Sequence, residues 1–457
     1  MKRLLIANRG EIAVRIIRAA RDLGIETVAV ASDADRDAAH ARLADTVVHV
    51  GPAPATKSYL RAEGIVAAAR EAGADAVHPG YGFLSERADF AAAVTDAGLT
   101  FVGPDAQVID QMGDKVRARQ VAMAAGVPTV PGTPDGVSDV SAAVAAAAGI
   151  GYPVMLKAAA GGGGRGIRVV SDEAELRAAF PTASAEAASA FGDGRMYLER
   201  FIRSSRHVEV QVLGDGSDAI HVFERECSLQ RRRQKVIEEA PAPGIDADIR
   251  AAMTSAAVRL CRQVGYRSAG TCEFLVDDHT GEFFFIEMNT RIQVEHPVTE
   301  LITGIDLVAE QLRIAAGEPL SFRQADVTKR GHAIEFRICA EDPDRGFLPG
   351  PGSINHVELP QGPWVRTDTW LAPGSAVSPF YDSLIAKVVV WGDTRTSALR
   401  RAHRALGEFI VEGVPTTTGL LTEIIGEPWF ASGEFDTGTL EDWLQQRTKP
   451  GEAGATR

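Results

Sequence analysis

The strongest constraint on the fold of this chain is a pair of adjacent strands. We expect them at residues 271–276 and 282–288, separated by a short polar turn that contains glycine. Such a pair forms an antiparallel hairpin. If its ladder is symmetric about the turn, Glu273 lies directly opposite Glu287. Asn289 then shares the same sheet face, because strand side chains alternate with a period of two.

The opposed carboxylates of this hairpin predict a metal site. Glutamates that face each other across a ladder lie about 5 Å apart and repel one another. A hard cation such as Mg²⁺ removes the repulsion, because it takes oxygen ligands and usually shares them with phosphates. The alternative is a different register in which both glutamates are solvated. We favour the metal site.

The second strand leads directly into a polar run at residues 287–297. This run holds carboxylates, carboxamides, a guanidinium and a histidine. Arg291 supplies an anion clamp and Glu295 a potential base. Such a set is catalytic in character and does not serve packing. It points to chemistry on a metal–nucleotide.

A glycine run at residues 161–166 predicts a flap over phosphates. It fits the pattern G-x-G-x-x-G, but a dinucleotide fingerprint opens a helix, whereas residues 167–170 have the character of a strand. No Gly-Lys-Ser/Thr follows, so the run is not a Walker A loop. A glycine hairpin exposes backbone N–H groups that can close over phosphates, with Lys157 as a nearby point charge. A plain surface loop is the less favoured alternative.

Three further motifs have ordinary structural explanations that the sequence leaves open. The basic stretch 230–235 is most often a solvated face, although it could serve an anionic substrate if it lined the same cleft as the metal. The segment 78–86 follows a strand end, where open α/β sheets bind ligands, but its spacing favours a simple turn. Arg337 alternates with apolar neighbours, and an arginine in such a strand usually forms an ion pair.

The order of expected strands and helices predicts three units. Apolar strands alternate with helices up to about residue 113, which predicts an open parallel α/β sheet in residues 1–113. Residues 114–328 hold the glycine run and the hairpin, and residues 329–446 form a third, mostly antiparallel unit. The polar tail at 447–457 is expected to be disordered. The length of 457 residues suits two to three domains.

Composition excludes several classes of function. A net charge of -13 weighs against nucleic acid as the main partner. No uninterrupted apolar stretch is long enough to span a bilayer, and the first residues do not resemble a secretory signal. The four cysteines have no paired spacing for zinc or for a redox motif, which favours a reducing compartment. We therefore expect a cytoplasmic protein without a membrane partner.

Together these motifs resemble those of the biotin carboxylases, the ATP-grasp enzymes of biotin-dependent carboxylases such as acetyl-CoA carboxylase. The resemblance covers nearly the whole chain outside the tail. It rests on residues 6–13, 78–86, 112–115, 157–166, 206–211, 238–244, 287–300, 341–343 and 381–383. Related ATP-grasp enzymes share the flap and the metal hairpin, but not the continuation at 291–297 in this combination.

The resemblance implies an α/β protein (α+β overall) whose central ATP-grasp domain carries a mobile glycine-rich lid at about residues 131–203. The implied ATP-binding residues are Lys115, Lys157, Gly163, Gly164, Glu199, Arg200, Phe201, Ile202, His207 and Arg233. The implied ligands of Mg²⁺ or Mn²⁺ are Glu273, Glu287 and Asn289, and the two glutamates also belong to the ATP site. The residues implied to surround bicarbonate and biotin are Lys235, Arg291, Gln293, Val294, Glu295 and Arg337.

The chemistry of the family makes sense of these residue types. Bicarbonate is a poor electrophile, so ATP first converts it to carboxyphosphate. Glu295 is the implied base, Arg291 stabilises the enolate-like biotin oxygen and Arg337 holds the anionic intermediate. With Lys235 they form the implied catalytic set. Lid closure would exclude the water that otherwise hydrolyses the intermediate.

The chain lacks a biotin attachment site, which needs a lysine flanked by methionines; its only Met-Lys pair is Met1-Lys2. We therefore expect the biotin on a separate biotin carboxyl carrier protein, and the carboxyltransferase on further separate subunits. The family also implies a homodimer. The acceptor of the carboxyl group stays open; acetyl-CoA would place the chain in fatty acid biosynthesis.

Two positions depart from the family pattern. Arg233 stands where the family usually has histidine, which puts any contact made by that histidine in doubt, and Ala160 replaces the first glycine of the flap. Two other functions remain as alternatives. One is another ATP-grasp ligase that activates a carboxylate as an acyl phosphate, and the other is a nucleotide-binding scaffold without catalysis.

Overall fold

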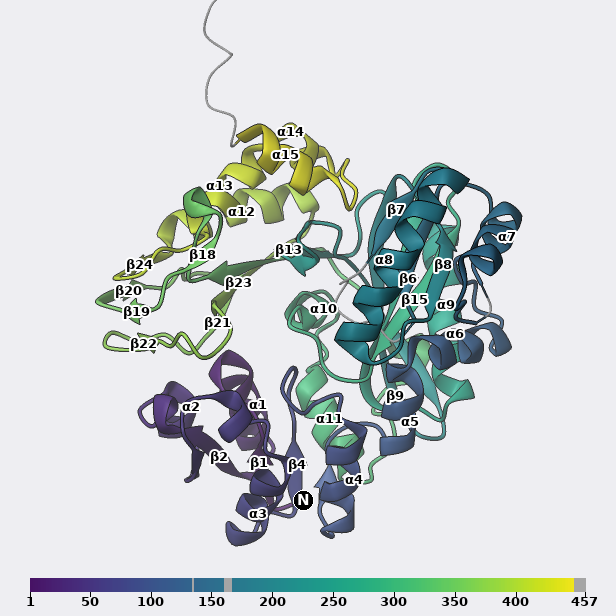
Figure 1. Cartoon of the computed structure of the whole chain (residues 1–457). Helices are drawn as coiled ribbons and strands as arrows, with labels where there is room; N and C mark the ends of the chain where they lie inside the picture. The colour runs from purple at the N-terminus through teal and green to yellow at the C-terminus, as the bar shows by residue number, and fades with distance from the viewer. Residues whose placement is uncertain (134, 160–166, 448–457) are drawn as a thin grey trace, which may run out of the picture.

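The computed structural model describes residues 1–133, 135–159 and 167–447 (Figure 1). The expected flap residues Gly163 and Gly164, the substituted Ala160 and the tail beyond residue 447 lie outside the described residues. None of the described helices is both long and apolar enough to cross a membrane.

The N-terminal part is an open parallel sheet, which confirms the prediction from alternating strands and helices. The strand order is β3-β2-β1-β4-β5, and every neighbouring pair is parallel. The strands are β1 (Arg3–Ile6), β2 (Glu26–Ser32), β3 (Thr46–Gly51), β4 (Ala76–His78) and β5 (Thr100–Phe101). The helices are α1 (Gly10–Asp22), α2 (Ala39–Leu43), α3 (Ala62–Glu71), α4 (Ala88–Asp96) and α5 (Ala106–Gly113).

A large antiparallel sheet forms the centre of the molecule. Its order is β15-β14-β9-β10-β13-β16-β23-β21. The strands are β9 (Ser205–Asp215), β10 (Ala219–Glu226), β13 (Ile237–Ala240), β14 (Arg267–Asp277), β15 (Phe283–Asn289), β16 (His332–Cys339), β21 (Val365–Thr369) and β23 (Leu384–Gly392). The ladder between β13 and β16 crosses residue 329, so the central and C-terminal parts of the chain share one sheet.

A small sheet with its own core stands beside this centre. Its order is β7-β6-β8, and helices α7 and α8 pack on it through apolar side chains such as Ala147 and Phe180 (Figure 1). The elements are α7 (Val140–Ile150), β6 (Val154–Ala158), β7 (Arg168–Val170), α8 (Glu173–Phe191) and β8 (Met196–Arg200), whereas the preceding helix α6 (Lys115–Ala124) packs against β15. This unit occupies the part of the chain in which the resemblance implies a lid.

The remaining elements cover the large sheet and connect it to the N-terminal part. In Figure 1 the N-terminal unit (purple) lies next to β21, and α1 contacts both β21 and β23. The helices are α9 (Ala247–Gln263), α10 (His296–Thr303), α11 (Leu307–Ala315), α12 (Arg395–Glu408), α13 (Thr418–Gly426), α14 (Pro428–Ser432) and α15 (Thr439–Arg447). The short strands are β11 (Gln230–Arg231), β12 (Gln234–Lys235), β17 (Glu341–Asp342), β18 (Leu348–Pro349), β19 (Gly352–Ser353), β20 (His356–Glu358), β22 (Ala376–Val377) and β24 (Ile410–Glu412).

The hairpin of β14 and β15 has the predicted register at its acidic residues. Glu273 pairs with Glu287, and Thr271 pairs with Asn289. The ladder is not symmetric over its whole length, because a bulge after Glu273 shifts the pairing by one residue towards the turn. The bulge keeps the acidic residues opposed while the apolar residues nearer the turn follow a different register.

Candidate active site

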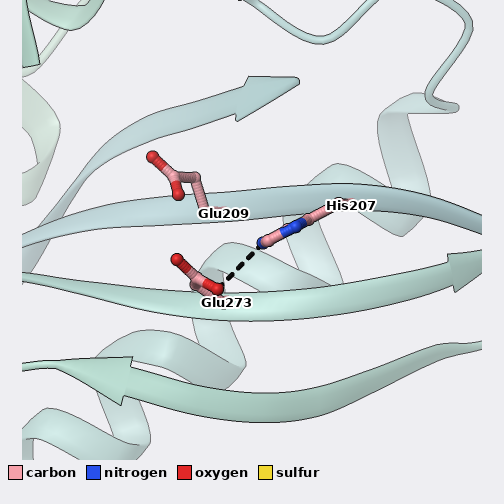
Figure 2. A group of neighbouring side chains, drawn as sticks. All are labelled: His207, Glu209 and Glu273. Carbon is pink, nitrogen blue, oxygen red and sulfur yellow. Dashed lines mark ion pairs between the residues drawn. The ribbon is translucent and has the colours of Figure 1, made fainter. Parts of the chain in front are cut away.

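Neighbouring strands bring an imidazole and two carboxylates together. His207 and Glu209 are two residues apart on β9, so their side chains share a face, and Glu209 pairs with Glu273 of β14. Figure 2 shows the three side chains converging on one face of the sheet. His207 Nε2 lies 3.0 Å from Glu273 Oε2. Burial disfavours the charged imidazole, but Glu273 outweighs this and holds the pKa of His207 above its usual value.

The basic stretch at 230–235 folds into a tight hairpin of β11 and β12. Its two turn residues, Arg232 and Arg233, have positive φ angles of 47° and 66°. Both central residues of a type I′ turn require such angles, which are rare for long side chains. The turn places Arg233, Gln234 and Lys235 along the cleft, so the stretch lines the same cleft as Glu273 and Glu287, although Arg233 and Gln234 remain exposed.

Lys235 lies at the centre of three carboxylates. Its Nζ is 2.5 Å from Glu209, 3.1 Å from Glu273 and 2.7 Å from Glu295. Burial opposes the charge on this ammonium, but the surrounding anionic groups raise the pKa of Lys235 well above its usual value. The ammonium therefore stays charged and removes the repulsion that three close carboxylates would otherwise suffer.

Glu295 is fully buried and held between two cations. Besides Lys235, Arg337 Nη2 donates to its second carboxylate oxygen at 2.9 Å. Arg337 in turn donates through Nε to Glu238 at 2.6 Å, so the guanidinium bridges two glutamates. Burial disfavours ionisation of Glu295, but Lys235 and Arg337 outweigh it and lower its pKa well below the usual range. The carboxylate is ionised throughout the physiological range.

A buried arginine holds the carboxylate of Glu209 in place. Arg225 is completely buried and donates through Nε to Glu209 at 2.5 Å and through Nη1 to Gln211 at 2.7 Å. It also donates to Thr299 at 3.0 Å and to Thr271 at 3.2 Å. These bonds fix the carboxylate of Glu209 next to the ammonium of Lys235.

Arg291 is positioned by groups on three sides. Its Nε donates to Glu86 at 2.9 Å, its Nη1 to Gln293 at 2.8 Å and its Nη2 to Asn289 Oδ1 at 3.0 Å. Glu86 belongs to the segment 78–86, for which the sequence favoured a simple turn. The structure shows that this segment reaches the site, with Tyr81 and Gly82 lining the cleft.

A cavity of about 650 Å³ lies between the large sheet and the small one. The expected ATP-binding residues within the described part of the chain all line it. They are Lys115, Lys157, Glu199, Arg200, Phe201, Ile202, His207, Arg233, Glu273 and Glu287. Apolar groups such as Met155 and Leu275 line it as well, while Lys157 pairs with Glu199 and Lys115 Nζ lies 3.5 Å from Glu287.

A second cavity, of about 440 Å³, adjoins the first. It is lined by Lys235, Asn289, Arg291, Gln293, Val294, Glu295 and Arg337. The two cavities share a wall of six residues: His207, Gln230, Arg233, Gln234, Glu273 and Glu287. A group bound in one cavity can therefore contact a group bound in the other.

The shared wall has the donors that a hard divalent cation needs. Glu273 and Glu287 supply carboxylate oxygens from opposed positions, and Asn289 Nδ2 donates to Glu273 at 2.9 Å. Among the described residues, two groups have metal-ligand spacing: His207, Glu209 and Glu273, and Glu209, Cys227 and Glu295. Neither group contains Glu287. Lys235 contacts Glu209, Glu295 and one oxygen of Glu273. The opposed carboxylates of Glu273 and Glu287 are oxygen donors of the kind that suits Mg²⁺.

Sequence reasoning missed four residues of this network: Glu86, Glu209, Arg225 and Glu238. Glu209 could have been found, because it follows His207 at the spacing of one strand face. Arg225 and Glu238 lie on β10 and β13 next to other charged residues (Glu224 and Glu226, and Glu239), and in the sequence they look like ordinary ion-pair partners. Only the sheet order brings these strands next to β9 and β16.

Three family models match consecutive parts of the chain. Residues 1–109 match the N-terminal domain of biotin carboxylase, and residues 335–442 match its C-terminal domain. Residues 114–323 match the ATP-binding domain of the carbamoyl-phosphate synthase large chain.

Relatives and solved structures cover nearly the whole chain. The biotin carboxylase of Pseudomonas aeruginosa is 54% identical over 447 residues, which is 97% of this chain and 99% of the relative. The biotin carboxylase domain of Hydrogenobacter thermophilus 2-oxoglutarate carboxylase, a dimer in complex with MgADP, ADP and bicarbonate, is 47% identical with a TM-score of 0.92, and the match covers 99% of each chain. Biotin carboxylase of Campylobacter jejuni in a β-γ-ATP complex is 44% identical with a TM-score of 0.92, covering 96% of this chain and 98% of that one.

Proposed function

Because the chain belongs to the biotin carboxylase family, ligases that carboxylate biotin with ATP, Mg²⁺ and bicarbonate, we propose that its two adjoining cavities divide this reaction between them. The larger cavity takes the nucleotide and the smaller takes bicarbonate and then the biotin ureido ring. The observation that carries the proposal is the wall the cavities share, since phosphoryl transfer from ATP to bicarbonate needs the two substrates in contact.

In the nucleotide cavity, we assign phosphate contacts to the lysines and base contacts to β8 and its continuation. Lys115 and Lys157 face acidic partners that a bound phosphate can replace. Glu199, Arg200, Phe201 and Ile202 line the same cavity, where backbone groups and apolar surface suit an adenine ring. His207 and Arg233 lie where this cavity meets the second.

The metal ligands in this proposal are Glu273, Glu287 and Asn289. Glu273 and Glu287 line both cavities, next to the expected position of the phosphates, and Asn289 lines the bicarbonate cavity. Mg²⁺ held there would neutralise charge on the phosphates during transfer. Glu273 also has Lys235 and His207 as partners, and these keep it ionised despite its burial.

On the bicarbonate side, Glu295 is the base and three cations bind the anion. Arg291, Arg337 and Lys235 all line the cavity with Gln293 and Val294. In the free protein Lys235 and Arg337 depress the pKa of Glu295, which makes it a weak base. A bicarbonate anion that shares these cations weakens their hold on Glu295 and raises its basicity when the substrate is present.

We also propose the assembly and compartment in which this site works. The biotin is carried by a separate biotin carboxyl carrier protein, and separate carboxyltransferase subunits use the product, as in a carboxylase such as acetyl-CoA carboxylase. The Hydrogenobacter relative is a dimer, which supports a homodimer here. The four cysteines are free thiols, which supports a reducing compartment, and we assign the cytoplasm.

The matched domains support the proposed division of the chain. We place an N-terminal domain at 1–113, an ATP-grasp domain at 114–328 with a lid at about 131–203, and a C-terminal domain from 329. Arg447, which the sequence assigned to the tail, is the last residue of α15 and pairs with Glu423 and Asp344, so the C-terminal domain includes it. The family matches end and begin close to these limits. The separate core of the small sheet supports a lid that moves as one body.

The experiment is carboxybiotin formation from ATP, bicarbonate and free biotin, with and without Mg²⁺. We expect turnover that needs all four components and that falls at least about a hundredfold in Glu295→Gln. Glu408→Gln, an exposed glutamate on α12, is the control and keeps wild-type turnover. An ATP hydrolysis rate that does not depend on bicarbonate would instead indicate another ATP-grasp ligase. Nucleotide binding without turnover would indicate a scaffold.

A further inference from the structure

A third cavity, of about 380 Å³, lies between the N-terminal unit and the C-terminal strands. One side comes from the start of α1 and the segment after β4. The other side comes from the residues around β21 and β23, including Trp370, Phe380 and Tyr381. None of these three aromatic residues lines the nucleotide cavity or the bicarbonate cavity.

The third cavity continues into the bicarbonate cavity. Four residues line both: Tyr81, Gly82, Asp382 and Leu384. Through them the aromatic cavity reaches the space that also holds Glu295 and Arg337. A molecule whose reactive end lies beside Glu295 can therefore extend its other end into the aromatic cavity.

The walls of the third cavity suit an uncharged, chain-like group. The Arg9 guanidinium is already paired with Asp35, with Nε 2.8 Å from the carboxylate, and its central carbon lies 4.3 Å from the centre of the Tyr381 ring. It is therefore not available as a counter-ion for an anionic ligand. Asp382 adds a negative charge at the junction. Aromatic faces, together with an arginine whose charge is already balanced by an aspartate, favour methylene groups over a carboxylate.

We propose that the third cavity binds the aliphatic arm that joins the biotin ring to a carrier lysine, as a neutral amide-linked chain. This inference rests on the proposed function, because it requires the ureido ring to react beside Glu295. The arm lies along Trp370 and Phe380, and Tyr81 and Gly82 mark the point where ring and arm meet. Free biotin, whose arm ends in a carboxylate, fits this site less well than biotin joined through an amide.

Phe380 gives the cleanest test of the arm site. It is 52% exposed, so its removal leaves no buried void, whereas Trp370 is only 6% exposed and belongs to the core. The substrates are free biotin, biocytin (biotin amide-linked to lysine) and biotin on its carrier domain. Wild-type protein should have a kcat/KM for biocytin several-fold above that for free biotin.

Phe380→Ala should lower kcat/KM for biocytin about fivefold to tenfold and should reduce the preference for biocytin over free biotin. This loss should exceed any change in bicarbonate-dependent ATP hydrolysis measured without biotin. Phe380→Leu keeps an apolar wall and should restore most of the preference. Met123→Ala removes a side chain of similar exposure (56%) on α6, far from the cavity in sequence and outside its lining, and is the control.

The outcomes separate the two proposals. If wild-type protein shows no bicarbonate-dependent ATP hydrolysis, the proposed function fails. If that activity is present but Phe380→Ala has the same kcat/KM for biocytin as the wild type, the proposed arm site is wrong. An effect seen with the carrier domain and absent with biocytin also overturns it, because it would place Phe380 on the carrier's docking surface and not along the arm.

Discussion

Lys235 and Glu295 form an ion pair 2.7 Å long in the wall of the bicarbonate cavity. The same ammonium also contacts Glu209 and Glu273. A single cation therefore holds together three carboxylates from three different parts of the chain. The ion pair gives the site its shape before any substrate binds.

Lys235→Met should both stop carboxylation and destabilise the protein. Without the ammonium, the buried carboxylates repel one another, and removing one partner of a buried pair typically costs about 3–5 kcal/mol. Urea unfolding measures the loss of stability, and carboxybiotin formation measures the activity. Lys57→Met, at an exposed position, is the control. A variant as stable as the wild type would show that the carboxylates do not depend on Lys235.

Glu287→Gln should weaken metal binding without disturbing the fold. Glu287 is partly exposed and opposes Glu273, so an amide at this position removes one anionic oxygen from the metal site. We expect at least about a tenfold rise in the Mg²⁺ concentration needed for half-maximal activity, equivalent to about 1.4 kcal/mol. Glu282→Gln changes a glutamate near the turn of the same hairpin and should leave the Mg²⁺ requirement unaltered.

Stability should fall between about pH 5 and pH 7 because of Glu226. Burial, opposed by Arg206 and Ser228, raises the pKa of this carboxyl from 4.5 to about 7. Between these values the folded protein keeps a proton that the unfolded chain has released, so stability declines as pH rises, by up to about 1.4 kcal/mol per pH unit. Above the folded pKa the loss is complete.

Glu226→Gln removes this titration and should make the protein more stable than the wild type at pH 8, by up to about 3 kcal/mol. Urea unfolding at several pH values measures the difference. The exposed Glu412→Gln should follow the wild-type curve. An identical decline with pH in Glu226→Gln would assign the effect to another group.

Arg233→His tests the departure from the family pattern. Arg233 lines both cavities, and a histidine is mostly neutral at pH 8, so the change removes a fixed positive charge from the shared wall. We expect the KM for ATP to rise about threefold to tenfold at pH 8. Arg233→Lys keeps the charge and should change it less. If Arg233→His lowers the KM, the arginine does not serve phosphate binding.

Local sequence patterns predicted the chemistry of the site better than its architecture. The period of two placed Glu273 opposite Glu287, and the register is as expected even though a bulge shifts the rest of the ladder. The segment 78–86 and the basic stretch 230–235 gave weaker signals, because a glycine-rich turn and a charged run occur on many surfaces. Their roles depend on Glu86 meeting Arg291 and on Lys235 meeting Glu295.

The sequence by itself determined the parallel N-terminal sheet, the hairpin with its opposed carboxylates and the residue types of the site. These features depend on periodicity and on neighbours close in the chain. Only the tertiary structure decided which strands lie side by side, and so which charges meet. Lys235 and Glu295 are sixty residues apart, on the small β11–β12 hairpin and on the segment between β15 and α10, and only the tertiary fold brings these two segments together. Burial then makes that contact strong, since few water molecules remain to screen it.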